Sequence, residues 1–228
     1  YNFIHRCYNM SITFSEVHVQ DRPYTGDDSI FHSVLYCSFE YQSLKKNMKS
    51  QDIAIVGILL AVGAIARFAA LYAPLPPFLV PNFVIVFYCL AIMLVVPKFS
   101  QALGIGFIGG IISALISHSI FPPGNLISEP IGAVACLLVF QALKTRFSAA
   151  PFAATLVATL ASGISFICIV MLLVMVAPGL LFKAFNYESM YAFFSAMMIM
   201  IVLPTAIINT IIAQLLYVPA SRALSRRS

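Results

Sequence analysis

Arg67 and Glu129 are the charged residues whose positions suggest chemistry, because apolar sequence lies close to each of them. Arg67 lies near the end of the apolar run 53–72, and an arginine near the centre of a membrane costs at least about 2.5 kcal/mol. Its side chain can reach the membrane surface, or it can pair with Glu129 or with an anionic substrate group such as a carboxylate. Pairing would make Arg67 a binding residue.

Glu129 directly precedes Pro130 at the expected start of a helix, where the helix dipole stabilises a negative charge. The sequence 121–128 before it is rich in turn residues and suggests a re-entrant segment. Irregular backbone is tolerated at membrane depth only where protein covers it or where it lines a cavity. Glu129 therefore either caps a helix or, together with Asn125, lines a substrate cavity that opens to the outside.

Asn82 and Asn209 add uncharged donors and acceptors within apolar sequence. Asn209 follows Pro204, which interrupts a helix and frees a backbone carbonyl. Either asparagine can bond between helices or contact a substrate.

Six apolar runs must position these side chains. Of the 228 residues, 61% are hydrophobic and only 9% are charged, whereas an average soluble domain is roughly 25% charged. About 20 apolar residues cross a bilayer as a helix. We therefore expect an all-α integral membrane protein with about six transmembrane helices, at 53–72, 78–96, 102–120, 130–143, 150–176 and 190–218.

The basic residues predict the orientation of these helices. From residue 45 on, they precede the first run, separate the second from the third and the fourth from the fifth, and follow the sixth, whereas the intervening connections hold only one basic residue, Lys183. Because positive charge collects on the cytoplasmic side, both ends of the bundle are predicted to be cytoplasmic. Residues 1–47 are polar and aromatic without periodicity. We expect them to be a disordered tail or an extension upstream of a natural start at Met48.

Small residues spaced four apart predict close contacts between helices. Such patterns are Gly57-x-x-x-Ala61, Gly106-x-x-x-Gly110, Gly109-x-x-x-Ser113 and the stripe Ala150, Ala154, Ala158 and Ser162. Each either packs within the bundle or docks a partner protein.

The sequence lacks the motifs that are typical of several function classes. The chain contains no P-loop, no H-E-x-x-H and no G-x-S-x-G. No cysteine pair is spaced for a metal, and the basic residues do not cluster as in a nucleic-acid-binding protein. We therefore expect neither an enzyme nor a chain with its own metal or cofactor.

Three segments in order resemble one family. They are Ile105–Leu115, Phe121–Gly124 with Glu129-Pro130, and Val202–Thr210. They are similar to the tryptophan-associated transporters called TrpP, and Met48–Ala64 resembles the first helix of the S-components of energy-coupling-factor importers. The resemblance covers residues 48–224.

The resemblance implies a six-helix subunit of a prokaryotic plasma membrane that captures a small molecule, either tryptophan or another aromatic amino acid. A separate transmembrane coupling subunit and two ATPases would supply the energy, with Gly57 and Ala61 docking the coupling subunit. The resemblance points to 76–82, Asn125 to Glu129 and Asn209 as the outward-facing substrate site. Aromatic stacking would then come from Phe78, Phe83 or Tyr187.

Two other functions stay open at this point. The chain is then either a stand-alone secondary transporter, or a subunit that assembles a membrane complex without binding a ligand. A single intramembrane charge, Arg67, speaks against an acid relay for ion coupling.

Overall fold

The structure is a computed structural model that describes residues 48–72, 82–116, 121–176 and 189–225. The chain divides into two units, Tyr1–Lys46 and Asn47–Ser228, and the second unit contains every described residue. The predictions for residues 1–47, for Phe78 and for Tyr187 therefore lie outside the described residues.

Helices form all of the regular structure in the described ranges. They are α3 (Ser50–Leu71), α4 (Phe83–Val95), α5 (Phe99–Ile116), η2 (Pro122–Gly124), α6 (Asn125–Leu143), α7 (Ala150–Val176), α9 (Met190–Met197), η3 (Met198–Val202) and α10 (Leu203–Ser225). The last three are continuous, and η3 is a π-helical turn just before Pro204. Among the described residues, five helical segments are long and apolar enough to cross a membrane, which confirms the predicted helical membrane bundle.

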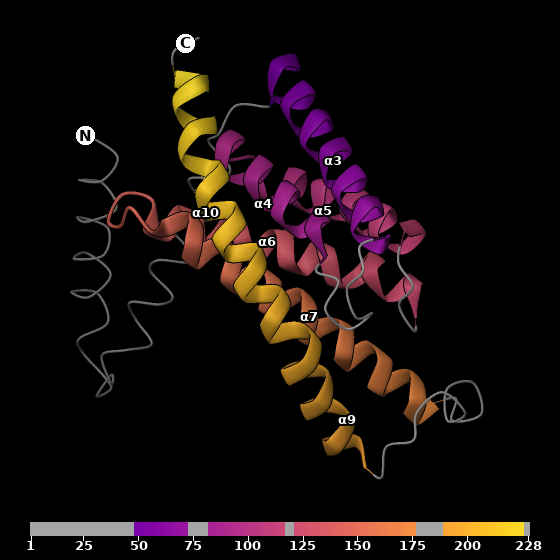
Figure 1. Cartoon of the computed structure of the whole chain (residues 1–228). Coiled ribbons are helices and arrows are strands. Elements are labelled where there is room, and N and C mark those ends of the chain that lie inside the picture. The colour runs from indigo at the N-terminus through magenta and orange to yellow at the C-terminus, as the bar shows by residue number, and fades with distance from the viewer. Residues whose placement is uncertain (1–47, 73–81, 117–120, 177–188, 226–228) are drawn as a thin grey trace, which may run out of the picture. The chain divides into compact units, whose positions relative to one another are not determined.

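The helix α4 lies at the centre of this bundle (Figure 1). It contacts α3, α5, α6, α7 and α10, and nine of its 13 residues are buried. At 1.5 Å per residue it is about 20 Å long, which is shorter than a bilayer crossing. Its C-cap residue, Val96, has a left-handed φ of 48°, and Pro97 follows. A helix with apolar residues on all sides is expected at a protein centre.

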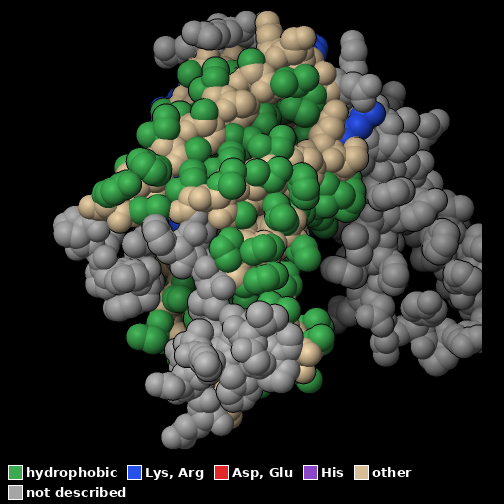
Figure 2. Space-filling view, turned by 90° about the vertical axis from the view of Figure 1, so that its right-hand side faces the viewer, with side chains coloured by type: hydrophobic (Ala, Val, Ile, Leu, Met, Phe, Trp, Pro, Cys, Tyr) green, Lys and Arg blue, Asp and Glu red, His purple; other side chains and the backbone are tan. Residues whose placement is uncertain are grey.

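Hydrophobic side chains cover much of the bundle surface. Figure 2 shows them over most of the described part of one face. The exposed large residues include Ile58 and Ile65 on α3, Leu115 on α5 and Leu172 on α7. Such a surface suits lipid, in agreement with the spans found by length and composition.

Glycines allow α5 and α6 to approach each other closely. A Cβ atom on Gly106 would lie 2.7 Å from the Pro130 Cα atom, and one on Gly110 would lie 2.6 Å from the Asn125 carbonyl oxygen. The predicted Gly106–Gly110 pattern is therefore a packing contact within the bundle. It holds the first turns of α6 against α5, where Glu129 lies.

Candidate functional site

Glu129 lies inside α6 and is only 1% exposed. The expected irregular segment before it is instead η2 followed directly by the first turn of α6. Pro130 lies inside the helix and does not start it. The capping interpretation of Glu129 is thus wrong, because its carboxylate accepts hydrogen bonds from side chains of other helices.

Three hydrogen bonds hold the Glu129 carboxylate. The Asn82 Nδ2 atom donates to Oε1 at 2.6 Å. The Tyr88 hydroxyl and the Ser162 hydroxyl donate to Oε2 at 2.9 Å and 3.1 Å. The donors come from the start of α4, from α4 itself and from α7, so this one carboxylate joins three helices. Hydrogen bonds to an ionised group are about twice as strong as those between neutral groups.

Further polar residues extend this network to the remaining long helices. Asn82 and the Ser113 hydroxyl on α5 lie within hydrogen-bond distance, with the Nδ2–Oγ distance at 3.3 Å. The Asn209 Nδ2 atom on α10 donates to the Asn82 carbonyl oxygen at 3.3 Å. Arg67 on α3, which is 9% exposed, interacts electrostatically with Glu129. We call these residues the Glu129 hub: Arg67, Asn82, Tyr88, Ser113, Glu129, Ser162 and Asn209.

Glycines also fix the position of Tyr88 in the hub. A Cβ atom on Gly132 would lie 2.6 Å from the Tyr88 hydroxyl oxygen and 3.0 Å from the Ser162 Cβ atom. A Cβ atom on Gly109 would lie 3.1 Å from the Tyr88 ring. The absence of side chains at Gly109 and Gly132 therefore gives the Tyr88 ring the room to reach Glu129.

Two buried oxygens, one on a hub residue and one on the residue before Glu129, have no hydrogen-bond partner among the described residues. They are the Asn209 Oδ1 atom and the Ser128 Oγ atom, and both residues are 0% exposed. An unsatisfied buried polar atom costs roughly 1–3 kcal/mol. These two oxygens therefore have unused capacity to accept hydrogen bonds.

The other residues singled out in the sequence lie elsewhere. Asn125 is buried at the start of α6, and its Nδ2 atom donates to the Pro122 carbonyl oxygen at 3.0 Å, so it stabilises η2 locally. Phe83 packs against the main core cluster around α4. Gly57 and Ala61 lie exposed on α3, and a Cβ atom on Gly57 would have nothing within 4 Å.

Sequence reasoning missed Tyr88 as a site residue and read Ser113 and Ser162 only as parts of small-residue patterns. Both serines pack between helices as those patterns predict, but their hydroxyls also join the hub. The sequence did hold one signal for these two serines. Alanine or glycine would allow the same close packing, so a serine at such a position indicates a hydrogen bond between helices. The chain also buries two opposite charges, Arg67 and Glu129, in place of the single one counted from the sequence.

The hub combines the groups that bind a zwitterion. A guanidinium binds a carboxylate through charge-assisted hydrogen bonds. A buried carboxylate with nearby amide and hydroxyl oxygens binds an ammonium group, which brings only donors. The surrounding apolar bundle strengthens both interactions because its effective dielectric constant is low.

Comparisons with known proteins give a consistent result. The family model described as tryptophan transporter TrpP matches residues 49–225. A relative from Bacillus subtilis (strain 168), named probable tryptophan transport protein, is 31% identical over 188 residues, which cover 79% of this chain and 96% of the relative. No solved structure matches the chain. The matched residues include every member of the Glu129 hub.

Proposed function

The chain belongs to the TrpP family of tryptophan transporters, and we propose that it captures tryptophan from outside the cell for import. The Glu129 hub is the proposed binding site for the amino-acid end of the substrate. Arg67 binds the carboxylate, while Glu129 and the Asn209 Oδ1 atom bind the ammonium group.

The observation that supports this site is the burial of two opposite charges inside an apolar bundle. Such a pair usually adds little stability over a well-packed apolar substitute, because removing both charges from water costs several kcal/mol. Ionisable residues in membrane segments therefore tend to mark a functional site. Here side chains from α4 and α7 hold the carboxylate in place, and unpaired acceptor oxygens lie on α6 and α10.

Energy for import comes, in this proposal, from a separate coupling subunit and ATPases of an energy-coupling-factor importer. Two observations support this division of labour. The sequence contains no P-loop. The Gly57-x-x-x-Ala61 pair is exposed on α3, where a partner helix can approach the backbone closely. The chain itself then needs no cofactor and catalyses no reaction.

A thermal-shift measurement on the purified chain tests substrate capture. A ligand at 100 times its dissociation constant stabilises a protein by about 2.7 kcal/mol. Tryptophan should therefore raise the melting temperature, whereas glycine and lysine should not. No shift with any amino acid would favour an assembly subunit without a ligand.

A second candidate function is stand-alone secondary transport, and the buried Glu129 carboxylate is the observation that favours it. A buried acid can carry a proton across the membrane together with the substrate. Vesicles that contain only this chain distinguish the two. Accumulation of tryptophan driven by a proton gradient would establish secondary transport. Accumulation only with the coupling subunit, its ATPases and ATP would establish the importer.

A further inference from the structure

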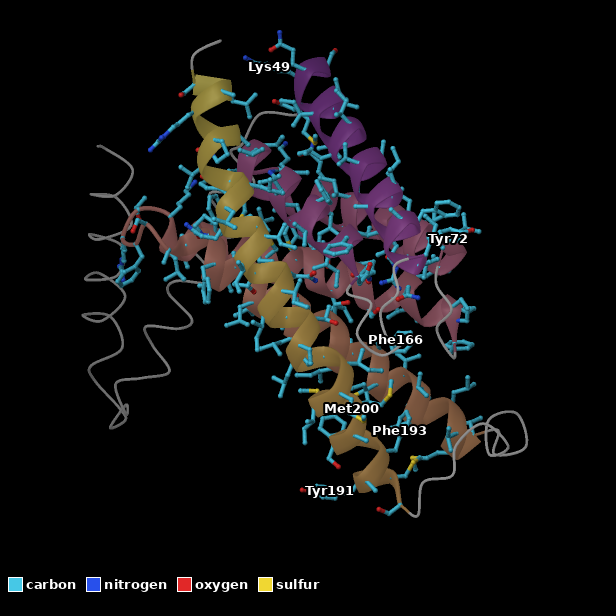
Figure 3. The ribbon with its side chains drawn as sticks, viewed as in Figure 1. Lys49, Tyr72, Phe166, Tyr191, Phe193 and Met200 are labelled. Carbon is cyan, nitrogen blue, oxygen red and sulfur yellow. The ribbon has the colours of Figure 1, made fainter. Side chains whose placement is uncertain are left out.

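A second hydrophobic cluster lies beside the Glu129 hub, apart from the main core cluster. It joins α7 to α9, η3 and the residue before η2, and its buried members include Phe193 and Val202. Figure 3 labels Phe166 on α7 and Phe193 on α9, both in the half of the bundle away from Lys49. We call its aromatic and methionine side chains the aromatic–methionine cluster: Phe121, Phe166, Met171, Phe193, Phe194, Met197 and Met198.

This cluster directly adjoins the hub through α7. Phe166 follows Ser162 by one helical turn, so the two side chains lie on the same face about 6 Å apart along the axis. Ser162 donates to Glu129. The Phe166 ring also lies against the start of α6, because a Cβ atom on Gly124 would be 2.9 Å from its Cε2 atom. An aromatic surface thus begins one helical turn from Ser162, whose hydroxyl donates to the buried carboxylate.

The π-helical turn η3 places Phe193 and Val202 on the same side of the segment that α9, η3 and α10 form. A regular α-helix turns about 100° per residue, so Phe193 and Val202 would face opposite sides. The wider turn at Met198–Val202 reduces that rotation, and both residues are buried in the same cluster. Val202 packs on α7 at Gly163, where a Cβ atom would lie 2.7 Å from the valine Cγ1 atom. Single π-helical turns occur frequently at functional sites.

The side chains of the cluster suit a large flat ring. Phenylalanine rings pair with other aromatic rings in stacked or edge-to-face arrangements. Methionine side chains are flexible and polarizable, and they make favourable contacts with aromatic rings while filling irregular gaps. An aromatic amino acid has the same layout as this region, with two charged groups a few ångströms from an apolar ring.

We infer that the aromatic–methionine cluster is the side-chain subsite of the transporter, where the indole ring of tryptophan binds while its amino-acid end is held by the Glu129 hub. This inference rests on the proposed function, since it assigns the second half of the same substrate. It also makes Phe166 and Phe194 residues that determine specificity for a large aromatic side chain.

Fluorescence tests the inference directly, because the chain contains no tryptophan. With excitation where tyrosine does not absorb, all emission comes from the added tryptophan, and the spectrum of free tryptophan is subtracted with a protein-free titration. Its emission should shift to shorter wavelength on binding to the purified full-length chain, as expected for indole in an apolar site. A saturating titration without such a shift would overturn the inference and leave substrate capture intact.

Substitutions then locate the subsite. Phe166→Leu and Phe194→Leu keep an apolar side chain of similar size, and both positions are only partly buried, so the fold should tolerate them. Each should weaken tryptophan binding about tenfold. The matched control is Phe140→Leu, which alters a 3% exposed phenylalanine in the main core cluster against Tyr217. That variant should bind within about twofold of the unaltered chain.

Three results are distinguishable. Weaker binding by both cluster variants, with Phe140→Leu unaffected, supports the subsite. Equal affinities for all three variants would refute the subsite while the proposed function stands. A complete lack of saturable tryptophan binding by the unaltered chain would overturn both proposals.

Discussion

Replacement of Gly132 by alanine provides a sharp test of the hub geometry. The added Cβ atom would lie 2.6 Å from the Tyr88 hydroxyl oxygen and 3.0 Å from both the Ala158 carbonyl oxygen and the Ser162 Cβ atom. The Tyr88 and Ser162 hydroxyls both donate to Glu129. The methyl group must therefore displace at least one donor of the buried carboxylate.

The expected loss of stability follows from two terms. Overpacking a well-filled core typically costs about 1–3 kcal/mol. Displacing the Tyr88 hydroxyl weakens a hydrogen bond to a charged group, which contributes about 1.5–3 kcal/mol. Alanine itself favours a helix over glycine by about 1 kcal/mol, and this gain cancels when two glycine-to-alanine changes in helices are compared. Since relaxation will recover part of the strain, we expect Gly132→Ala to be about 2–4 kcal/mol less stable than a glycine-to-alanine change in open space.

Gly104 on α5 supplies that control, because a Cβ atom there would have nothing within 4 Å. Thermal unfolding of both variants in the same detergent compares them directly. For a chain of this size, 1 kcal/mol corresponds to roughly 2–4 °C in melting temperature. Gly132→Ala should melt well below Gly104→Ala and bind tryptophan more weakly. Equal melting temperatures would refute the packing of Tyr88 against Gly132 and with it the geometry of the hub.

Three further variants follow from the same contacts. Arg67→Ala should reduce both stability and tryptophan binding, because it leaves the Glu129 carboxylate without its opposite charge. The double variant with Glu129→Gln should recover the melting temperature but not the binding. Unchanged affinity in Arg67→Ala would exclude this arginine from the site. Tyr88→Phe removes a 2.9 Å hydrogen bond to the carboxylate and should cost about 1.5–3 kcal/mol in thermal unfolding; a melting temperature equal to the unaltered chain would contradict this. Gly57→Leu should abolish ATP-driven uptake in vesicles that contain the coupling subunit, while tryptophan binding persists. The control is Gly104→Leu, because a Cβ atom at either glycine has nothing within 4 Å. Normal uptake by Gly57→Leu would exclude this surface as the docking site.

The helical spans were predictable because hydropathy and length determine them without any knowledge of packing. The run expected at 150–176 coincides with α7. The run expected at 53–72 extends one residue beyond the end of α3, and the run expected at 190–218 lies inside the α9–α10 segment. The predicted cytoplasmic location of both ends remains a prediction. The short central α4 was not predictable, since its sequence is as apolar as that of a lipid-facing helix.

The candidate site was only partly predictable. An arginine and a glutamate near apolar runs are conspicuous, and the sequence raised their pairing as one possibility. Tyr88 and Ser162 gave no comparable signal, because a tyrosine in an apolar run and a serine in a small-residue pattern are common packing residues. Their roles depend on where α4 and α7 cross α6, which only the tertiary structure defines. Pro130 suggested a helix start, yet α6 begins before it because η2 leads into its first turn.

The predicted aromatic contribution of Phe78, Phe83 or Tyr187 stays a prediction, because Phe78 and Tyr187 lie outside the described residues. The third residue, Phe83, is partly buried, and its side chain packs against the main core cluster. Phe166 and Phe193 are far apart in the chain and belong to one cluster only because α7 packs against α9 and the π-helical turn.

Titration of tryptophan into the purified chain, with and without Glu129→Gln, tests the central claim most directly. The matched control is Asp52→Asn, the same acid-to-amide change at a residue that accepts the Lys49 backbone N–H at the start of α3. Loss of the buried charge should weaken binding about 30-fold, equivalent to about 2 kcal/mol, while the control binds normally. Equal affinities for the unaltered chain and for a folded Glu129→Gln variant would contradict a substrate site at the Glu129 hub.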